Sequence, residues 1–491
     1  MKNNSLDFYN EKVHEECGVF GIYKMDDEVD VASISRDALY ALQHRGQESA
    51  GIAVNNDGNF KSIKDVGMVS EVLTNQAMEE LGTDGKIAIA HVRYTPYQAL
   101  DRAGSQPLVI RYIQGSLAIC HNGSITNFAE IRKNLEEGGA IFQSFSNAEL
   151  IAYVIATERV NSETIEDAVK NACNKIEGAY SFVLTSPSKL IAVRDPYGFR
   201  PLCVGKLGQS YVVASESCAF DSIGAQFIRH VKPGEMVVID EDGFHSYMIE
   251  KPKKSALCVF EYVYIARPDS ILDCGPVHAV RKEFGKELAR DFPVEADLVC
   301  GVPDSGNEAA QGYAEESGIP YSAVFVKNKY IGRSLSSMKN TKKERLLMMR
   351  LNVLKHKVRG KKVVIIDDSI VHGSTASHIV KLLREAGAAE VHMRISSPPL
   401  KYSCYYGSDL HTEKNMIANL MTVEELQNFV GSDSLGFLSI ESLRKISNEN
   451  GVSVCDACFT GNYTGPVPKE NYVAIPLTSP LWKILLSEFL P

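Results

Sequence analysis

The chain contains 491 residues, 44% of them apolar and 23% charged, which is typical of a globular protein with two or three domains. Its net charge of −9 argues against a nucleic-acid-binding role, since neutralising phosphates requires clustered Lys and Arg. No apolar run approaches the ~20 residues that span a bilayer, so we expect no membrane segment. Residues 1–16 lack the apolar core of a secretory signal, and eleven scattered cysteines do not suggest a disulfide framework. We therefore expect a cytoplasmic location.

The first apolar strand is predicted to begin at Cys17-Gly18, directly after a polar leader. A Cys beside a Gly at the start of a strand is usually a small buried residue. Alternatively, cleavage after Glu16 makes Cys17 the new N-terminus. Its own α-amine, with a reference pKa near ~8, then serves as general base for the thiol. The cysteine alone leaves both interpretations open.

Three further motifs follow in order: A-L-Q-H-R-G-Q-E-S-A-G-I at 41–52, H-V-R-Y-T at 91–95 and C-H-N-G-S-I-T-N at 120–127. Together with C-G-V-F at 17–20, they resemble the class II glutamine amidotransferases. The resemblance extends to about residue 240. It implies the N-terminal-nucleophile fold, in which two sheets lie between two layers of helices in the order αββα.

The resemblance also implies a role for individual residues of this chain. Cys17 attacks the side-chain amide of glutamine and releases ammonia. Asn122 and Gly123 form the oxyanion hole, whose donors matter because negative charge develops on the amide oxygen. Arg93 binds the substrate carboxylate, a task suited to a planar two-pronged cation, and Arg45 shapes the pocket around the nucleophile.

Two departures from the usual family sequence bear on glutamine binding. Asn147 stands where an Asp commonly receives the α-ammonium group of glutamine, and residues 95–98 read T-P-Y-Q instead of the usual small, hydroxyl-rich run. Asn147 offers a carbonyl oxygen but no charge, and a charge-assisted hydrogen bond is roughly twice as strong as a neutral one. We therefore expect a raised glutamine KM, with ammonia as a usable substitute.

The charged, proline-containing segment K-P-K-K-S at 251–255 predicts a domain boundary, although it reads equally well as a surface turn. We accordingly divide the chain into four parts. These are a propeptide at 1–16, a glutaminase domain at 17–250, a second domain at 255–465 and a C-terminal tail at 466–491.

Beyond this boundary, apolar strands are predicted at 298–302, 321–326, 363–366 and 391–395, separated by helical lengths. This alternation predicts a parallel sheet with helices on both faces. The chain as a whole then combines an α+β domain with an α/β domain. Ligands bind such sheets at the carboxyl ends of the strands, and two acidic pieces of sequence fall there. They are Asp304-Ser305 and Asp367-Asp368.

The run V-V-I-I-D-D-S-I-V-H-G-S-T at 363–375 combines a buried strand, two carboxylates, a small loop and the start of a helix. Backbone N–H groups of the loop and the helix dipole favour a phosphate, while the carboxylates suit sugar hydroxyls or a metal. An acidic cap on an ordinary helix is the simpler interpretation. The run resembles the signature of the type I phosphoribosyltransferases, which implies that Asp367 and Asp368 hold the ribose hydroxyls. The loop that binds the 5′-phosphate would then include Ser369, Ile370, Val371, His372, Gly373, Ser374 and Thr375, with His372 replacing the usual Arg.

The two motif sets together resemble the amidophosphoribosyltransferase family of purine synthesis, and the runs 261–270, 301–305 and 327–333 also match it. The resemblance implies that ammonia displaces diphosphate from phosphoribosyl diphosphate to give 5-phosphoribosylamine. It further implies feedback inhibition by purine nucleotides and a homotetramer. Mg²⁺ would lie near Ser305, Asp367 and Asp368, with Asp304 as a further candidate, and the phosphate-binding cations would be Lys327, Arg333 and Arg350.

Cys455 and Cys458 form a C-x-x-C pair, which alone suggests zinc, a redox pair or no function. Their local sequences, with those of Cys258 and Cys404, resemble the four ligands of a [4Fe–4S] cluster in one branch of this family. That branch also carries a cleaved propeptide. The resemblance implies a structural cluster that ties the C-terminal segment to the start of the second domain.

Two other functions stay open. One is a degenerate paralogue that senses phosphoribosyl diphosphate or uses free ammonia, as Asn147 and His372 suggest. The other is a different class II amidotransferase, such as a sugar-phosphate aminating enzyme, which the Asp367-Asp368 pair opposes.

Overall fold

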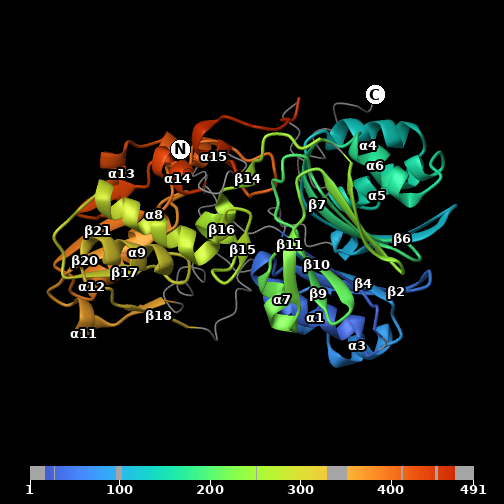
Figure 1. Ribbon diagram of the computed structural model, residues 1–491. Coiled ribbons are helices and arrows are strands. Elements are labelled where there is room, and N and C mark those ends of the chain that lie inside the picture. The colour runs from blue at the N-terminus through green and yellow to red at the C-terminus, as the bar shows by residue number, and fades with distance from the viewer. Residues whose placement is uncertain are drawn as a thin grey trace, which may run out of the picture.

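The computed structural model describes residues 17–26, 28–94, 102–249, 251–328, 351–410, 413–447 and 452–469. The predicted propeptide, Arg333 and Arg350 lie outside these ranges. Two lobes stand side by side, one blue to green and one yellow to red (Figure 1). Within the described ranges, every helix is too short or too polar to cross a membrane.

The first lobe is built on two antiparallel sheets that face each other (Figure 1). Because both faces of each sheet are covered, the central strands are largely buried, and all six residues of the strand Gly18–Tyr23 (β1) are buried. In sheet order, the seven-stranded sheet contains β11 (Gln226–His230), β9 (Cys203–Leu207), β10 (Ser210–Ala214), β1 (Gly18–Tyr23), β4 (Ile87–Arg93), β2 (Ser49–Asn56) and β3 (Asn59–Val66). The six-stranded sheet contains β13 (Gly243–Met248), β12 (Glu235–Asp240), β8 (Leu190–Arg194), β7 (Gly178–Thr185), β6 (Gly115–Ile125) and β5 (Leu108–Tyr112).

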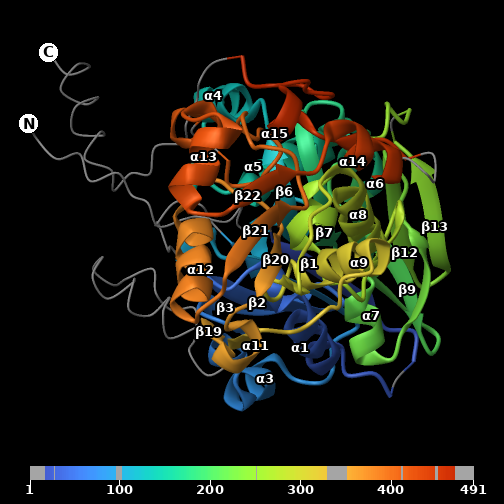
Figure 2. The same ribbon diagram turned by 90° about the vertical axis from the view of Figure 1, so that its left-hand side faces the viewer.

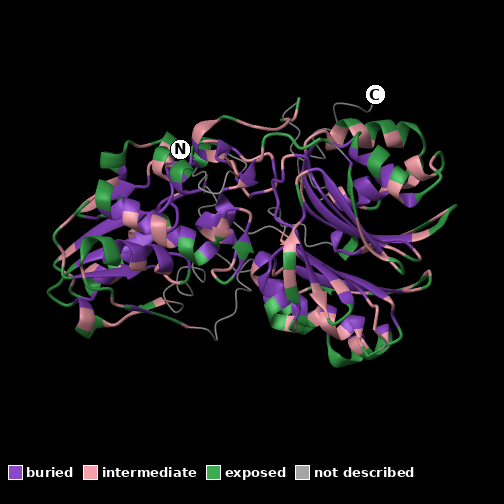
Figure 3. Ribbon diagram, viewed as in Figure 1, coloured by how far each residue is buried: buried purple, intermediate pink, exposed green. Residues whose placement is uncertain are grey.

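Helices cover the outer face of each sheet, so the first lobe has the four αββα layers that the sequence predicts. Three separate cores fill the spaces between neighbouring layers, as the buried strands in Figure 3 show. Val19 and Tyr23 of β1 point into the core between the sheets, and Phe20 and Ile22 point toward the helices. The helices on the seven-stranded sheet are α1 (Val31–Leu42), α2 (Val69–Val72), α3 (Asn75–Leu81) and α7 (Cys218–Ile223), and those on the six-stranded sheet are α4 (Phe128–Glu137), α5 (Asn147–Arg159) and α6 (Ile165–Cys173).

The second lobe has a four-stranded parallel sheet with helices on both faces (Figure 2). Alternate residues of the central strand point to opposite sides, so Val363 and Ile365 join one core and Val364 and Ile366 the other. The strands are β17 (Leu298–Gly301), β20 (Lys362–Asp367), β21 (Glu390–Ile395) and β22 (Ser434–Phe437). One face carries α8 (Val277–Asp291), α9 (Asn307–Ser317) and α14 (Ile440–Ser447), and the other carries α11 (Lys355–Val358), α12 (Ser374–Glu385) and α13 (Val423–Val430).

The strand predicted at 321–326 is divided in the structure. Tyr321 makes a single parallel bridge to Val299 at the edge of the sheet. The chain then leaves the sheet, and β18 (Phe325–Lys327) pairs antiparallel with β19 (Leu351–Val353). Residues 325–326 are therefore in a strand, as predicted, but the expectation that the run 321–326 joins the parallel sheet was wrong beyond Ser322, because β18 pairs with β19 instead.

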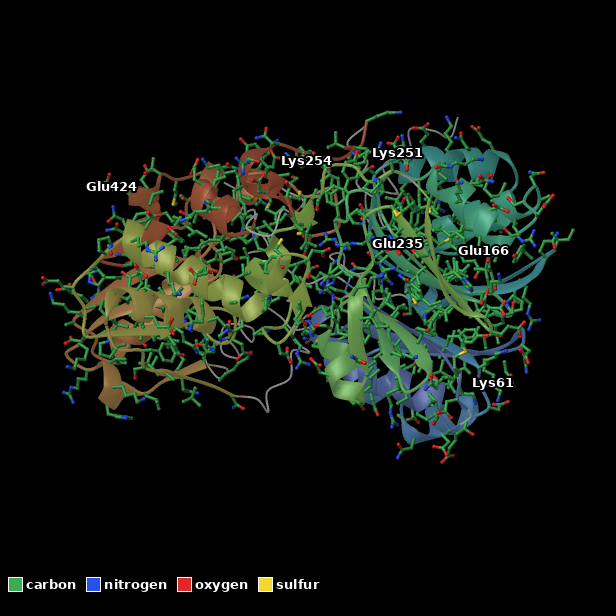
Figure 4. All side chains as sticks on the ribbon, in the orientation of Figure 1. Lys61, Glu166, Glu235, Lys251, Lys254 and Glu424 are labelled. Atoms are coloured by element: carbon green, nitrogen blue, oxygen red, sulfur yellow. The ribbon has the colours of Figure 1, made fainter. Side chains whose placement is uncertain are left out.

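The segment predicted as a boundary crosses between the lobes, with Lys251 on the side of the first and Lys254 closer to the second (Figure 4). It is fixed to the first lobe, since the backbone N–H groups of Lys253, Ala256 and Cys258 donate to the carbonyl oxygens of Pro196, Tyr197 and Phe199 at 2.8–3.0 Å. A hairpin of β15 (Ile271–Leu272) and β16 (Gly275–Pro276) adds a second attachment. Asp273, in the turn of this hairpin, accepts two hydrogen bonds of 2.8 and 2.9 Å from the buried guanidinium of Arg194.

Candidate functional site

Cys17 lies at the start of β1, where the alternation that sends Val19 and Tyr23 between the sheets sends it there as well. Its thiol is 3.7 Å from the carbonyl oxygen of Tyr94, the residue after β4. Asn122 reaches the same layer from the other sheet, because it alternates with Ala118 and Cys120, which fill that core. Two residues 105 positions apart in the sequence therefore face one space.

Gly123 occupies the position in β6 whose backbone is turned away from β7. Tyr180 lies opposite Gly123 in the ladder, and its own N–H and C=O both bond to Asp195 instead. The pair is therefore a non-hydrogen-bonded one, and the N–H of Gly123 faces the other edge of β6. That edge is open here, because β5 pairs with β6 only as far as Ile119.

Two features of this strand suit an oxyanion hole. The side chain of Asn122 is fully buried, yet neither its oxygen nor its nitrogen has a hydrogen-bond partner among the described residues. Gly123 has a φ of +128°, and a Cβ there would lie 2.2 Å from the carbonyl oxygen of Ala179. Glycine is therefore required at this position. An unpaired amide donor and an outward N–H are thus adjacent.

The side chain of Arg45 binds the backbone of Cys17. Its Nε donates to the carbonyl oxygen of Cys17 at 3.2 Å. Its two terminal nitrogens form a bidentate pair with Glu261 of the second lobe at 2.9 and 2.7 Å, and one of them also contacts Glu216. Burial alone disfavours the guanidinium charge, but the two carboxylates raise the pKa of Arg45 well above its usual range.

Arg93 ends β4 beside the nucleophile, and two glycines make room for it. A Cβ on Gly104 would lie 2.4 Å from a terminal nitrogen of the Arg93 guanidinium, and one on Gly46 would collide with the Arg93 backbone. The side chain is half-buried and therefore accessible to a carboxylate.

Asn147, the first residue of α5, lies against the same open edge of β6. Its Nδ2 is 3.4 Å from the carbonyl oxygen of Gly123, and its Oδ1 is 3.5 Å from the N–H of Ile125. Both contacts are long for hydrogen bonds. They place Asn147, the predicted ammonium-binding residue, next to Asn122 and Gly123 of β6. An Asp at position 147 could not donate to the carbonyl oxygen of Gly123.

In the second lobe, Asp367 ends β20 and Asp368 follows it at the carboxyl edge of the sheet. Both are buried. Asp368 accepts a hydrogen bond of 2.7 Å from the Ser369 hydroxyl and a second from Ser305, which follows β17 on the neighbouring strand. The sheet therefore brings together the two acidic pieces of sequence, as predicted.

The predicted phosphate loop lines a small hollow between β20 and α12. Gly373 adopts the left-handed conformation, with a φ of 84°, and precedes the first turn of α12. The N-terminus of that helix therefore faces the hollow, as an anion site requires. His372 points away, and its Nδ1 lies 2.7 Å from the carbonyl oxygen of Asn415. The hollow is lined by Asp367, Ser369, Ile370, Val371, Gly373, Thr375 and Ala376.

Lys327 and Asp304 form an ion pair at the mouth of the same edge. The Asp304 side chain is 78% exposed and that of Lys327 is 39% exposed, so the pair is accessible to a ligand and contributes little to stability. Lys327 thus lies next to Asp304, and its predicted role in phosphate binding stays a prediction.

The four cysteines assigned to a cluster line one pocket. β14 (Leu257–Cys258) pairs in parallel with β23 (Val454–Cys455), which puts Cys258 opposite Cys455. Burial raises the pKa of the Cys455 and Cys458 thiols. Across the described ranges, no three His, Cys, Asp or Glu side chains gather closely enough to hold a single metal ion. The other lining residues are Phe199, Phe260, Tyr406, Ser408, Leu410, Ala457 and Tyr463.

Sequence reasoning missed several residues around the nucleophile. Glu216 accepts a hydrogen bond of 2.6 Å from Ser270 across the junction and lies 2.7 Å from His44 Nε2. Burial opposes its charge, but His44 and Arg45 lower its pKa. The run 261–270, which contains Glu261, matches the family in sequence. The meeting of Glu216 and Glu261 at Arg45 follows only from the packing of the two lobes.

Comparison with known proteins supports both halves. Residues 91–222 match a glutamine amidotransferase domain, and residues 269–398 match a phosphoribosyl transferase domain. The amidophosphoribosyltransferase of Bacillus subtilis (strain 168) is 43% identical over 466 residues, covering 94% of this chain and 95% of that protein. The one from Archaeoglobus fulgidus is 41% identical over 459 residues, covering 93% and 99%.

Solved structures give the same result. The glutamine phosphoribosylpyrophosphate amidotransferase of B. subtilis, complexed with ADP and GMP, is 42% identical, with a TM-score of 0.85. The match covers 92% of this chain and 98% of that one. A second structure, described as the allosteric regulatory enzyme of purine biosynthesis, has a TM-score of 0.87 at 41% identity.

The fold and the two sites define a glutamine amidotransferase joined to a phosphoribosyltransferase, and therefore an enzyme of the pentosyltransferase class. Identity above 40% over almost the whole length makes the assignment specific. The chain belongs to the amidophosphoribosyltransferase family, and the degenerate-paralogue alternative is not favoured.

Proposed function

We propose that this chain makes 5-phosphoribosylamine from phosphoribosyl diphosphate, with ammonia that its first domain releases from glutamine. The proposal is supported by Cys17 and Asn122, which face the same layer between the sheets, and by the N–H of Gly123, which points to the open edge of β6 next to Asn122. A nucleophile beside two adjacent donors is the arrangement that acyl transfer from an amide requires.

In the first half-reaction, the Cys17 sulfur attacks the side-chain carbonyl carbon of glutamine. The carbonyl oxygen gains negative charge, which Asn122 Nδ2 and the N–H of Gly123 stabilise. The α-amine of Cys17 takes the proton from the thiol and passes it to the amide nitrogen as the C–N bond breaks, so that ammonia leaves and a thioester remains. Water hydrolyses the thioester to glutamate and restores the thiol. Arg93 binds the α-carboxylate of the substrate.

In the second half-reaction, Asp367 and Asp368 accept hydrogen bonds from the ribose hydroxyls, and the loop from Ile370 to Thr375 binds the 5′-phosphate. The ammonia nitrogen forms a bond to C1 of the ribose as the bond from C1 to diphosphate breaks. Ser305, Asp367 and Asp368, with Asp304 as a further candidate, would hold Mg²⁺, which would supply positive charge to the departing diphosphate. Lys327 contributes positive charge there.

Cys258, Cys404, Cys455 and Cys458 would hold a [4Fe–4S] cluster with a structural role. Support comes from the convergence of four thiols on one largely apolar pocket. In such a cluster each thiolate binds a different iron, so the four sulfurs need not converge on a single point. Burial disfavours these thiolates without a metal, and bound iron would offset that cost.

Three further parts of the proposal rest on the family. The first part is the division into a propeptide (1–16), a glutaminase domain (17–250), a phosphoribosyltransferase domain (255–465) and a C-terminal tail (466–491). The second is that purine nucleotides inhibit the enzyme. The third is that four copies of the chain assemble. The ADP and GMP bound in the B. subtilis structure support inhibition by purine nucleotides.

The proposed activity is tested by measuring diphosphate release from anaerobically purified protein, first with glutamine and then with ammonia. We expect release with both donors and an intact mass that begins at Cys17. Release with neither donor would overturn the proposal, whereas release with ammonia alone would refute only the glutaminase half.

A further inference from the structure

His91 is a fully buried histidine beside the proposed oxyanion hole, and the reaction scheme above gives it no task. It lies on β4, where it alternates with Ile87 and Ile89, and both of these fill the core between the sheets. Its side chain therefore crosses the layer between the sheets toward β6. There its Nε2 lies 3.1 Å from the carbonyl oxygen of His121, the residue before Asn122.

The backbone of His121 faces the open edge of β6. Residues 121 and 123 have the same orientation, because backbone groups of alternate strand residues point to the same edge. Since β5 is no longer paired beyond Ile119, no neighbouring strand satisfies the N–H and C=O of His121 there. Two side chains do so instead. The Oε1 of Gln106 accepts a hydrogen bond from the N–H at 2.7 Å, and His91 contacts the C=O.

The protonation of His91 follows from this geometry. A carbonyl oxygen can only accept, so Nε2 must carry the hydrogen. Burial lowers the pKa of His91 to about 3, which keeps the ring neutral with Nδ1 unprotonated. The Nδ1 atom has no partner among the described residues, so the bond to His121 is the polar contact that the ring makes.

We propose that His91 and Gln106 are positioning residues of the glutaminase, which replace the missing neighbour of β6 and so fix Asn122 and Gly123 in the orientation that binds the oxyanion. The inference rests on the proposed role of Asn122 and Gly123. A strand edge held at residue 121 on both its N–H and its C=O cannot twist without moving the next two residues. Displacement of such donors by a fraction of an ångström weakens their effect on the transition state.

The test uses two variants of His91 that differ only in reach. In His91→Gln, the amide nitrogen is as many bonds from Cβ as Nε2 of histidine, so it can still donate to the carbonyl oxygen of His121. In His91→Asn, the amide ends one bond short. We expect His91→Asn to lower the glutamine-dependent kcat at least tenfold with the glutamine KM within twofold, and His91→Gln to recover most of the kcat.

Two readouts separate positioning from folding. The ammonia-dependent rate depends on the second lobe and should stay within twofold of wild type in both variants. Alkylation of Cys17 by iodoacetamide needs the thiol but no oxyanion hole, so its rate should also be unchanged. The same substitution at a surface histidine, His245→Asn, is the matched control and should change none of these quantities. Gln106→Met, which removes the acceptor, should reproduce the kcat-only loss.

The inference is overturned if His91→Asn keeps the wild-type kcat, if Asn and Gln are equally impaired, or if the ammonia-dependent rate falls in parallel. Cys17→Ala distinguishes this failure from that of the proposed function. If Cys17→Ala abolishes the glutamine-dependent rate while His91→Asn does not change it, only the positioning role is wrong. If Cys17→Ala keeps that rate, the proposed glutaminase function of Cys17 is wrong.

Discussion

The two sites of this protein are built in opposite ways. Most of the proposed phosphoribosyl site comes from one continuous run, in which β20 ends at Asp367 and α12 begins at Ser374, and neighbouring segments add Asp304, Ser305 and Lys327. The glutaminase site takes Cys17, Arg93 and Asn122 from three strands in two different sheets. A local unit tolerates movement of the surrounding fold, whereas a site assembled from strand edges depends on buried contacts that hold those edges.

The first way to test this comparison is to remove the nucleophile alone. Cys17→Ala should reduce glutamine-dependent product formation by on the order of ten thousandfold, because no other group can form the thioester. The ammonia-dependent rate should stay near wild type, since the second site is a separate unit. Diphosphate release with each donor measures both. An equal loss with ammonia would show that the sites are not separable in this way.

A charge-neutralising substitution in the second lobe should lower the glutamine-dependent and the ammonia-dependent rate alike. Asp368→Asn keeps the size of the side chain but weakens its hydrogen bonds to a ribose hydroxyl, and hydrogen bonds to charged groups contribute about 1.5–3 kcal/mol. We expect kcat/KM for phosphoribosyl diphosphate to fall about 10- to 150-fold with glutamine and with ammonia alike. Glu424→Gln, a matched change on the exposed surface in Figure 4, is the control. Normal activity of Asp368→Asn would exclude this carboxylate from the site.

Removal of one proposed cluster ligand tests a third region, where the two ends of the second domain meet. Cys455→Ser should lose iron and sulfide and lower the anaerobic Tm by about 5 °C or more, because a ligand bound only to the folded state stabilises it. Cys173→Ser, a buried cysteine of α6 outside the pocket, should keep the iron content of wild type. Iron-free wild-type protein from anaerobic cells would contradict the cluster.

The smallest expected effect concerns the substrate ammonium group. Asn147→Asp should lower the glutamine KM about fivefold, equivalent to roughly 1 kcal/mol, because a carboxylate gains a charge-assisted bond. The gain is limited, since Asp cannot donate to the carbonyl oxygen of Gly123 as the Asn amide does at 3.4 Å. Steady-state kinetics with glutamine gives the value, and Asn171→Asp on exposed helix surface provides the comparison. An unchanged KM would exclude Asn147 from ammonium binding.

The motifs predicted the architecture of both lobes. Asp304-Ser305 and Asp367-Asp368 meet at one sheet edge because parallel neighbouring strands end together, a rule that the sequence pattern already contains. The pairing with the parallel sheet expected for residues 323–326 failed for the converse reason. An apolar run shows that residues are buried or paired, but the choice between β17 and β19 as partner depends on where those strands lie.

By itself, then, the sequence determined what depends on local order: the strand-loop-helix phosphate site, the glycine at 123 and the alternation that sends Cys17 and Asn122 to one face of their strands. Only the tertiary structure decided what depends on contacts between distant segments. It joined Arg45 to Glu261 across the lobes, gathered four cysteines around one pocket and placed His91 against His121. Such pairs leave no periodic trace in the sequence, because their partners belong to strands and loops whose separation is set by the packing of the whole chain.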